Sequence, residues 1–263
     1  MEENKKFKLV SSKKTRYLLP NILTLGGVCL GISSIKFSID GNYSLAVTFI
    51  LFAAILDALD GRIARLIKGT SEFGKELDSL TDFVSFGIAP AFVLYFWELN
   101  NYGKLGWAIT LIYSVCCVLR LARFNLTKVD KEQVWKNNYF EGIPSPAGGL
   151  LILMPLIFEL TDLKLNFDIK TIVPYYTVVI AFLLVSKLPT LSLKKISISP
   201  KSTVFILLGI GMSFISFLYY TFETLLAFGL LYLASVPASF FIYQKQSKKE
   251  ISEILDEDHE DVL

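Results

Sequence analysis

Four aspartates, Asp57, Asp60, Asp78 and Asp82, lie in one short stretch between two strongly apolar segments. Carboxylates are costly at the edge of an apolar environment unless they have partners. The first two are three residues apart and the last two are four apart, so each pair occupies one face of a helix. If the two helices form an antiparallel hairpin, all four carboxylates converge and repel each other. Divalent cations between them would remove this repulsion, and oxygen ligands suit Mg²⁺, Mn²⁺ or Ca²⁺ better than zinc.

Small residues continue the face that carries the first aspartate pair. Gly61 and Ala64 leave a gap in which a flat base or a diphosphate could approach the helix. Arg65 follows, with a fork of donors that suits phosphate, although an arginine here also suits an anchor at the membrane interface. Cations that neutralise a diphosphate and a base that accepts a hydroxyl proton are the components of phosphoryl transfer. The alternative of ordinary helix-end carboxylates explains one aspartate better than four on matched faces.

The elements that must position these residues are predicted to be membrane helices. The chain has 263 residues, of which 53% are hydrophobic, and apolar runs near membrane-spanning length recur along most of it. We expect an all-α, polytopic helical membrane protein with about eight transmembrane helices. The expected transmembrane catalytic domain covers 18–243, between a basic N-terminus (1–17) and a charged tail (244–263). The predicted spans are 18–38, 43–66, 79–98, 105–124, 146–160, 171–188, 202–220 and 222–243.

Lysine and arginine concentrate at alternate connections between these spans, which marks the cytoplasmic side. The connections around 39–42, 99–104, 161–170 and 221 are much poorer in both residues. An eight-span arrangement with both termini in the cytoplasm fits this distribution. We therefore expect an integral multi-pass protein of the inner (cell) membrane, with the aspartates at its cytoplasmic interface.

Other residue types exclude several kinds of chemistry. The lone His259 lies in the acidic tail, which excludes histidine-based catalysis in the core. The spacing of Cys29, Cys116 and Cys117 matches no zinc pattern. A cation transporter is a remote alternative, but transport sites usually lie near the bilayer midplane in proteins with repeated halves. We see no repeat here, and no nucleic-acid partner is expected.

The order and spacing of the aspartates point to a family. The pattern Asp57-x2-Asp60-Gly61-x2-Ala64-Arg65-x8-Gly74-x3-Asp78-x3-Asp82 resembles, position for position, the signature of the CDP-alcohol phosphotransferases. Members of that family transfer a phosphoryl-linked group from a CDP-alcohol to an acceptor hydroxyl and release CMP. The resemblance implies a six-helix catalytic core, a homodimer, and one or two divalent ions, Mg²⁺ or Mn²⁺.

The resemblance also implies a role for each residue of the pattern. Asp57, Asp60 and Asp78 would hold the metal ions, and Asp82 would help to bind a second metal or act as the general base. The expected cytidine nucleotide site consists of Asp60, Gly61, Ala64, Arg65 and Gly74.

Four blocks of sequence narrow the acceptor. They are "LPNILTLGGVCLGISS" (19–34), "TSEFGKELDSLTDFVSFGIAPA" (70–91) around the last two aspartates, "LRLARFN" (119–125) and "FEGIPSPAGG" (140–149), and together they resemble the membrane-embedded phosphatidylserine synthases. This resemblance implies that CDP-diacylglycerol, a membrane lipid, and L-serine are the substrates. The serine carboxylate needs a cationic partner, and Arg120, Arg123 and Asn125 lie at the cytoplasmic end of the fourth span, although both arginines also suit interface anchors. An alternative keeps the chemistry and changes the acceptor, as in a phosphatidylglycerophosphate synthase.

Overall fold

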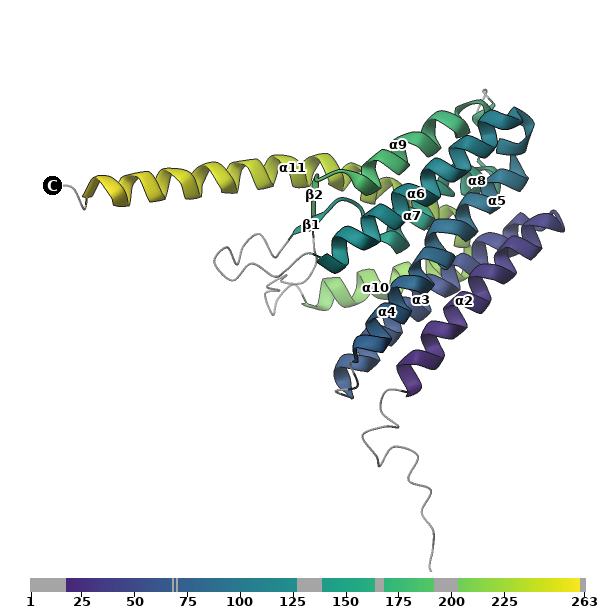
Figure 1. Cartoon of the computed structure of the whole chain (residues 1–263), viewed down its shortest axis with the longest axis horizontal. Helices are drawn as coiled ribbons and strands as arrows, with labels where there is room; N and C mark the ends of the chain where they lie inside the picture. The colour runs from purple at the N-terminus through teal and green to yellow at the C-terminus, as the bar shows by residue number, and fades with distance from the viewer. Residues whose placement is uncertain are drawn as a thin grey trace, which may run out of the picture.

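A computed structural model describes residues 18–67, 69, 71–126, 139–163, 168–191 and 203–260. The basic N-terminus predicted for residues 1–17 lies outside the described residues. Within them the chain is almost entirely helical, and most helices pack into one bundle (Figure 1). Five helical segments are long and apolar enough to cross a membrane, and two shorter apolar helices accompany them in this described part. The prediction of a polytopic helical membrane protein is confirmed.

The first half of the bundle follows the predicted spans closely. Helix α2 (Leu18–Ile39) and helix α3 (Tyr43–Leu66) begin where expected. Helix α6 (Lys104–Leu126) extends its predicted span by one to two residues at each end. A short 3₁₀ segment, η2 (Leu99–Tyr102), precedes α6.

The third span differs from its prediction. It begins with α4 (Glu72–Asp82), continues through one π-helical segment, η1 (Phe83–Ile88), and ends with α5 (Ala89–Trp97). The helix starts seven residues before the predicted position because the Ser71 side chain caps it, accepting a hydrogen bond of 3.0 Å from the Gly74 amide. Its first turns are polar, so hydropathy alone did not include them.

The second half of the chain is less regular. The predicted fifth span consists of two short helices, α7 (Ser145–Ile152) and α8 (Met154–Glu159), and η4 (Ile169–Ile172) leads into α9 (Val173–Val185). Helix α10 (Thr203–Tyr219) precedes the long α11 (Thr221–Glu260), which extends far beyond the bundle in Figure 1. Helix α11 passes the predicted boundary at residue 243 without a break. Strands β1 (Tyr139–Glu141) and β2 (Pro189–Leu191) form an antiparallel pair that hydropathy did not predict.

Small residues on α2 bring it close to the third span. A Cβ atom on Gly31 would lie 3.0 Å from the Cα of Ser85, and the Ser85 hydroxyl donates a hydrogen bond of 3.1 Å to the carbonyl of Gly27. This spacing of glycines allows the two backbones to approach each other. The contact holds the middle of α2 against the third span, which also carries Asp78 and Asp82.

Helix α6 is tied to the π-helical segment by two hydrogen bonds. The buried Tyr113 hydroxyl donates to the carbonyl of Phe86 at 3.0 Å, and the Ser114 hydroxyl donates to the carbonyl of Gly87 at 3.2 Å. A π turn interrupts the regular helical ladder, so these side-chain bonds help to satisfy its carbonyl groups. The register of α6 against the third span, and hence of Arg120 against Asp82, is set by these contacts.

Candidate functional site

Three of the four aspartates converge in the folded chain. Asp57 and Asp60 project from α3 and Asp78 from α4, and one oxygen atom from each lies within 4.8 Å of the others. Asp60 is buried, and the other two are half-buried. Carboxylates this close repel each other unless a cation lies between them, and an oxygen-only donor set suits Mg²⁺, Mn²⁺ or Ca²⁺. The donor set therefore fits a divalent metal ion.

Asp82 lies at the edge of this acidic cluster. It is one turn beyond Asp78 on α4 and only 9% exposed. Its carboxylate lies within hydrogen-bond reach of the Asp57 carboxylate, while its Oδ1 atom is buried without a hydrogen-bond partner. A buried oxygen without a donor is rare in folded proteins. Asp82 is therefore placed to accept a proton or to complete a metal site.

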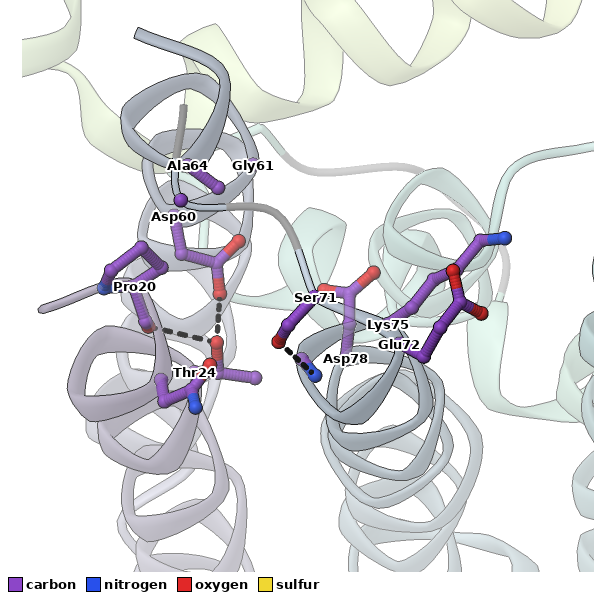
Figure 2. Close-up of a pocket in the computed structure, with 12 residues that line it drawn as sticks. Pro20, Thr24, Asp60, Gly61, Ala64, Ser71, Glu72, Lys75 and Asp78 are labelled. Carbon is purple, nitrogen blue, oxygen red and sulfur yellow. Dashed lines mark hydrogen bonds between the residues drawn. The ribbon is translucent and has the colours of Figure 1, made fainter. Parts of the chain in front are cut away.

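Helix α2 contributes a residue that the sequence did not single out. The Thr24 hydroxyl lies 2.6 Å from Oδ2 of Asp60 and 2.9 Å from the carbonyl of Pro20, as the dashed lines in Figure 2 show. Because Thr24 is buried, this hydrogen bond holds the Asp60 carboxylate in one orientation. The sequence contains no signal for this contact, because the two residues are 36 positions apart.

A pocket of about 570 Å³ opens directly beside the acidic cluster, between the starts of α2 and α4 and the end of α3 (Figure 2). Asp60 and Asp78 belong to both the cluster and the pocket wall. Of the predicted nucleotide-binding residues, four line the pocket: Asp60, Gly61, Ala64 and Gly74. The other described lining residues are Pro20, Asn21, Thr24, Gly69, Ser71, Glu72, Lys75 and Asp78.

Arg65, the fifth predicted nucleotide-binding residue, is placed differently. Its side chain is exposed, its Nε donates a hydrogen bond of 3.0 Å to the carbonyl of Gly61, and it is not among the described residues that line the pocket. Lys75, which is not among the predicted nucleotide-binding residues, does line the pocket. A flexible ammonium group at the pocket wall suits a phosphate. The assignment of Arg65 stays a prediction.

Substituting Gly61 tests whether the pocket holds the nucleotide. A Cβ atom on Gly61 would meet nothing within 4 Å, so Gly61→Val is expected to fold with an unchanged melting temperature. Its side chain would enter the pocket, and we expect the KM for the cytidine substrate to rise about tenfold, the effect of losing roughly 1.4 kcal/mol of binding. Steady-state kinetics and thermal unfolding measure the two effects.

The matched control is Gly209→Val, in α10, where an added Cβ also meets nothing within 4 Å. It should change neither the KM nor the melting temperature. An unchanged KM in Gly61→Val would remove Gly61 from the nucleotide site.

Among the three predicted acceptor-binding residues, Arg120 interacts with the acidic cluster. It is 9% exposed, its guanidinium interacts electrostatically with Asp82 and Asp57, and its Nη1 donates a hydrogen bond of 2.6 Å to the hydroxyl of Ser145. A buried arginine is rare unless it has partners. The predicted role of Arg120 in acceptor binding stays a prediction.

The other two predicted acceptor-binding residues contact different partners. Nη1 of the half-buried Arg123 donates to the carbonyl of Val185 at 2.7 Å, at the end of α9, where the last carbonyls lack helical partners. Nδ2 of the exposed Asn125 donates to the hydroxyl of Ser79 at 3.0 Å. These bonds join α6 to α9 and α4. Their predicted roles in acceptor binding stay predictions.

Comparison with known proteins agrees with this geometry. A family model described as CDP-alcohol phosphatidyltransferase matches residues 17–236. The chain is 36% identical over 184 residues to a protein of Mycobacterium tuberculosis, covering 70% of this chain and 64% of the relative. It is 32% identical over 199 residues to a protein of Helicobacter pylori, covering 76% and 82%. Both relatives are named CDP-diacylglycerol–serine O-phosphatidyltransferase, and the match spans slightly less than two thirds of the mycobacterial relative's length.

Proposed function

Because this chain belongs to the CDP-alcohol phosphatidyltransferase family, we propose that it transfers the phosphatidyl group of CDP-diacylglycerol to L-serine, giving phosphatidylserine and CMP. The observation that carries the proposal is the pocket of about 570 Å³ that shares Asp60 and Asp78 with the acidic cluster. This volume lies within the range of ordinary ligand pockets. A nucleotide in the pocket would have its diphosphate beside the carboxylates. The names of the relatives support serine as the acceptor.

The donor set supports a divalent metal cofactor. Asp57, Asp60 and Asp78 would hold Mg²⁺ or Mn²⁺, as one or two ions, and Asp82, which interacts with Asp57, would help to bind a second ion. Such an ion, held by these carboxylates, would supply positive charge for the diphosphate and the departing CMP. Thr24 keeps Asp60 oriented for this purpose.

The chain's own residues then perform the remaining steps. Gly61 and Ala64 leave room for the nucleotide, and Lys75 offers a positive charge at the pocket wall. Arg120 binds the serine carboxylate. Asp82, directly or through a water molecule, accepts the proton of the serine hydroxyl. The serine oxygen forms a bond to the lipid-side phosphorus, and the bond from that phosphorus to CMP breaks.

The membrane arrangement follows from the same proposal. Helices α2, α3, α6 and α9, the α4–α5 span and the α7–α8 pair would form the six-helix core, and α10 and α11 would complete eight spans. Exposed apolar side chains on α10, such as Phe205 and Leu207, suit contact with lipid. We propose both termini in the cytoplasm, the site at the cytoplasmic face of the inner membrane, and a homodimeric assembly. Family membership argues against the cation-transporter alternative.

An acceptor panel tests the proposed function. Purified protein with CDP-diacylglycerol and Mg²⁺ or Mn²⁺ is expected to release CMP when L-serine is added, and phosphatidylserine should form in equal amount. Glycerol 3-phosphate and inositol phosphate serve as competing acceptors. CMP release that is independent of serine, or a preference for glycerol 3-phosphate, would contradict the serine assignment and favour a phosphatidylglycerophosphate synthase.

A further inference from the structure

A second group of buried polar side chains adjoins Asp82 on its α6 side. Asp82 and Arg120 are each 9% exposed, and Tyr232 of α11 has a buried hydroxyl. The Arg120 guanidinium interacts electrostatically with both Asp82 and Tyr232. Tyr232 lies in the predicted eighth span, outside the six-helix core implied for the family. The group therefore joins α4 and α6 of the core to the last membrane helix.

Several polar atoms of this group have no hydrogen-bond partner. Among the described residues, buried side-chain atoms without a partner occur at Thr81, Asp82, Arg120 and Tyr232. Three of these residues belong to the group, where the atoms are Oδ1 of Asp82, Nε of Arg120 and the hydroxyl of Tyr232. The Thr190 side chain of β2 lies near the Tyr232 hydroxyl, but its own hydroxyl donates to the carbonyl of Gly142 at 2.8 Å. Buried polar atoms are normally paired, so three unpaired atoms in one interacting group indicate the position of a polar ligand.

The chemistry of these atoms specifies the ligand. Arg120 Nε is a donor, the Tyr232 hydroxyl can donate, and the ionised Asp82 accepts. A carboxylate accepts hydrogen bonds from Arg120 Nε and the Tyr232 hydroxyl, and a hydroxyl donates one to Asp82. Serine has both groups, because its carboxylate is attached to Cα and its hydroxyl to the neighbouring Cβ. Resting on the proposed function, we propose that Arg120 and Tyr232 together bind the acceptor's carboxylate while Asp82 receives its hydroxyl, which makes Tyr232 an acceptor-binding residue.

Neighbouring contacts hold the two carboxylate-binding residues in place. Ser145, at the start of α7, accepts a hydrogen bond of 2.6 Å from Nη1 of Arg120, which leaves Nε for a ligand. Helix α11 packs against α8 and β2. Gly229, one turn before Tyr232, lies so close to Met154 that an added Cβ would stand 2.2 Å from its sulfur atom. Close packing at this turn holds Tyr232 against the core.

Tyr232→Phe tests the inference because it removes the hydroxyl and little else. We expect the KM for L-serine to rise about tenfold, the usual effect of losing one hydrogen bond to a charged group, with the KM for CDP-diacylglycerol unchanged. The matched control is Tyr220→Phe, which removes a hydroxyl from a side chain that is 63% exposed, and both KM values should stay at the wild-type level. If the wild-type protein uses serine and Tyr232→Phe has the same KM for serine, the inference is overturned while the proposed function stands. Failure of the wild-type protein to use serine would overturn the proposed function.

Acceptor analogues provide a second test that needs no variant. L-Alanine keeps the carboxylate and lacks the hydroxyl, whereas ethanolamine keeps the hydroxyl and lacks the carboxylate. If Arg120 and Tyr232 bind a carboxylate, alanine should inhibit the wild-type enzyme competitively with serine, and ethanolamine at the same concentration should neither inhibit nor accept the phosphatidyl group. Ethanolamine acting as strongly as alanine would overturn the inference even if Tyr232→Phe did not fold.

Discussion

Asp82→Asn is expected to lower the rate of CMP release by about a hundredfold to ten-thousandfold, the range that general bases contribute. Asparagine has nearly the same shape as aspartate but cannot accept the serine proton. The native Oδ1 is buried and has no hydrogen-bond partner, so no protein contact is lost at that atom. The variant should therefore fold and bind CDP-diacylglycerol with a KM near that of the wild-type protein. Serine-dependent CMP release at saturating substrate measures the effect.

Raising the divalent metal concentration separates the two roles proposed for Asp82. A residue that acts as the base leaves a defect that additional Mg²⁺ or Mn²⁺ cannot restore. A residue that contributes only a metal ligand weakens metal binding, and a high metal concentration then restores the rate. Asp40→Asn is the matched control, because Asp40 is exposed and pairs with Lys36 at the far end of α2. Rescue of Asp82→Asn to the wild-type rate by metal would contradict the role as base.

The acidic cluster could be predicted from the sequence because its determinants are local. Two helical faces, set by spacings of three and four residues, and a short connection are enough to bring Asp57, Asp60 and Asp78 together. The boundaries of α2 and α3 were also predictable, because each apolar run ends at polar residues such as Asp40 and Asn42. The early start of α4 could not be predicted from hydropathy, because it depends on the cap that the Ser71 side chain provides.

Contacts between distant segments account for what the sequence did not predict. Thr24 donates a hydrogen bond to Asp60, which is 36 positions away in the sequence. Arg120 interacts electrostatically with Tyr232, which is more than a hundred positions away. Neither pair has a periodicity that marks it, because each depends on how whole helices pack. The β1–β2 pair is invisible for a further reason: its three-residue strands are too short for a recognisable alternation. The acidic cluster was therefore more predictable than the contacts between helices that are distant in the sequence.

Asp60→Asn is expected to raise the stability of the protein when divalent metal is absent and to lower its activity when divalent metal is present. Without metal, the variant removes one of three converging negative charges, while its side-chain oxygen still accepts the Thr24 hydrogen bond. The apparent melting temperature in a chelator should therefore rise above that of the wild-type protein, because less repulsion remains. Activity at a fixed Mg²⁺ concentration should fall by more than about a hundredfold, because losing a metal ligand costs more than losing an outer-shell partner of a ligand, which costs about 10- to 100-fold.

The response to metal decides what this substitution means. Binding to the folded state alone stabilises a protein by RT ln(1 + [L]/Kd), so wild-type protein should melt at a higher temperature as Mg²⁺ or Mn²⁺ is added. With one carboxylate replaced, the same titration should produce a much smaller rise, and Asp40→Asn should behave as the wild type does. An equal metal-induced rise in Asp60→Asn would show that Asp60 is not a ligand, whatever its activity. Because thermal unfolding needs no substrate, the result bears on the metal site independently of which acceptor the enzyme uses.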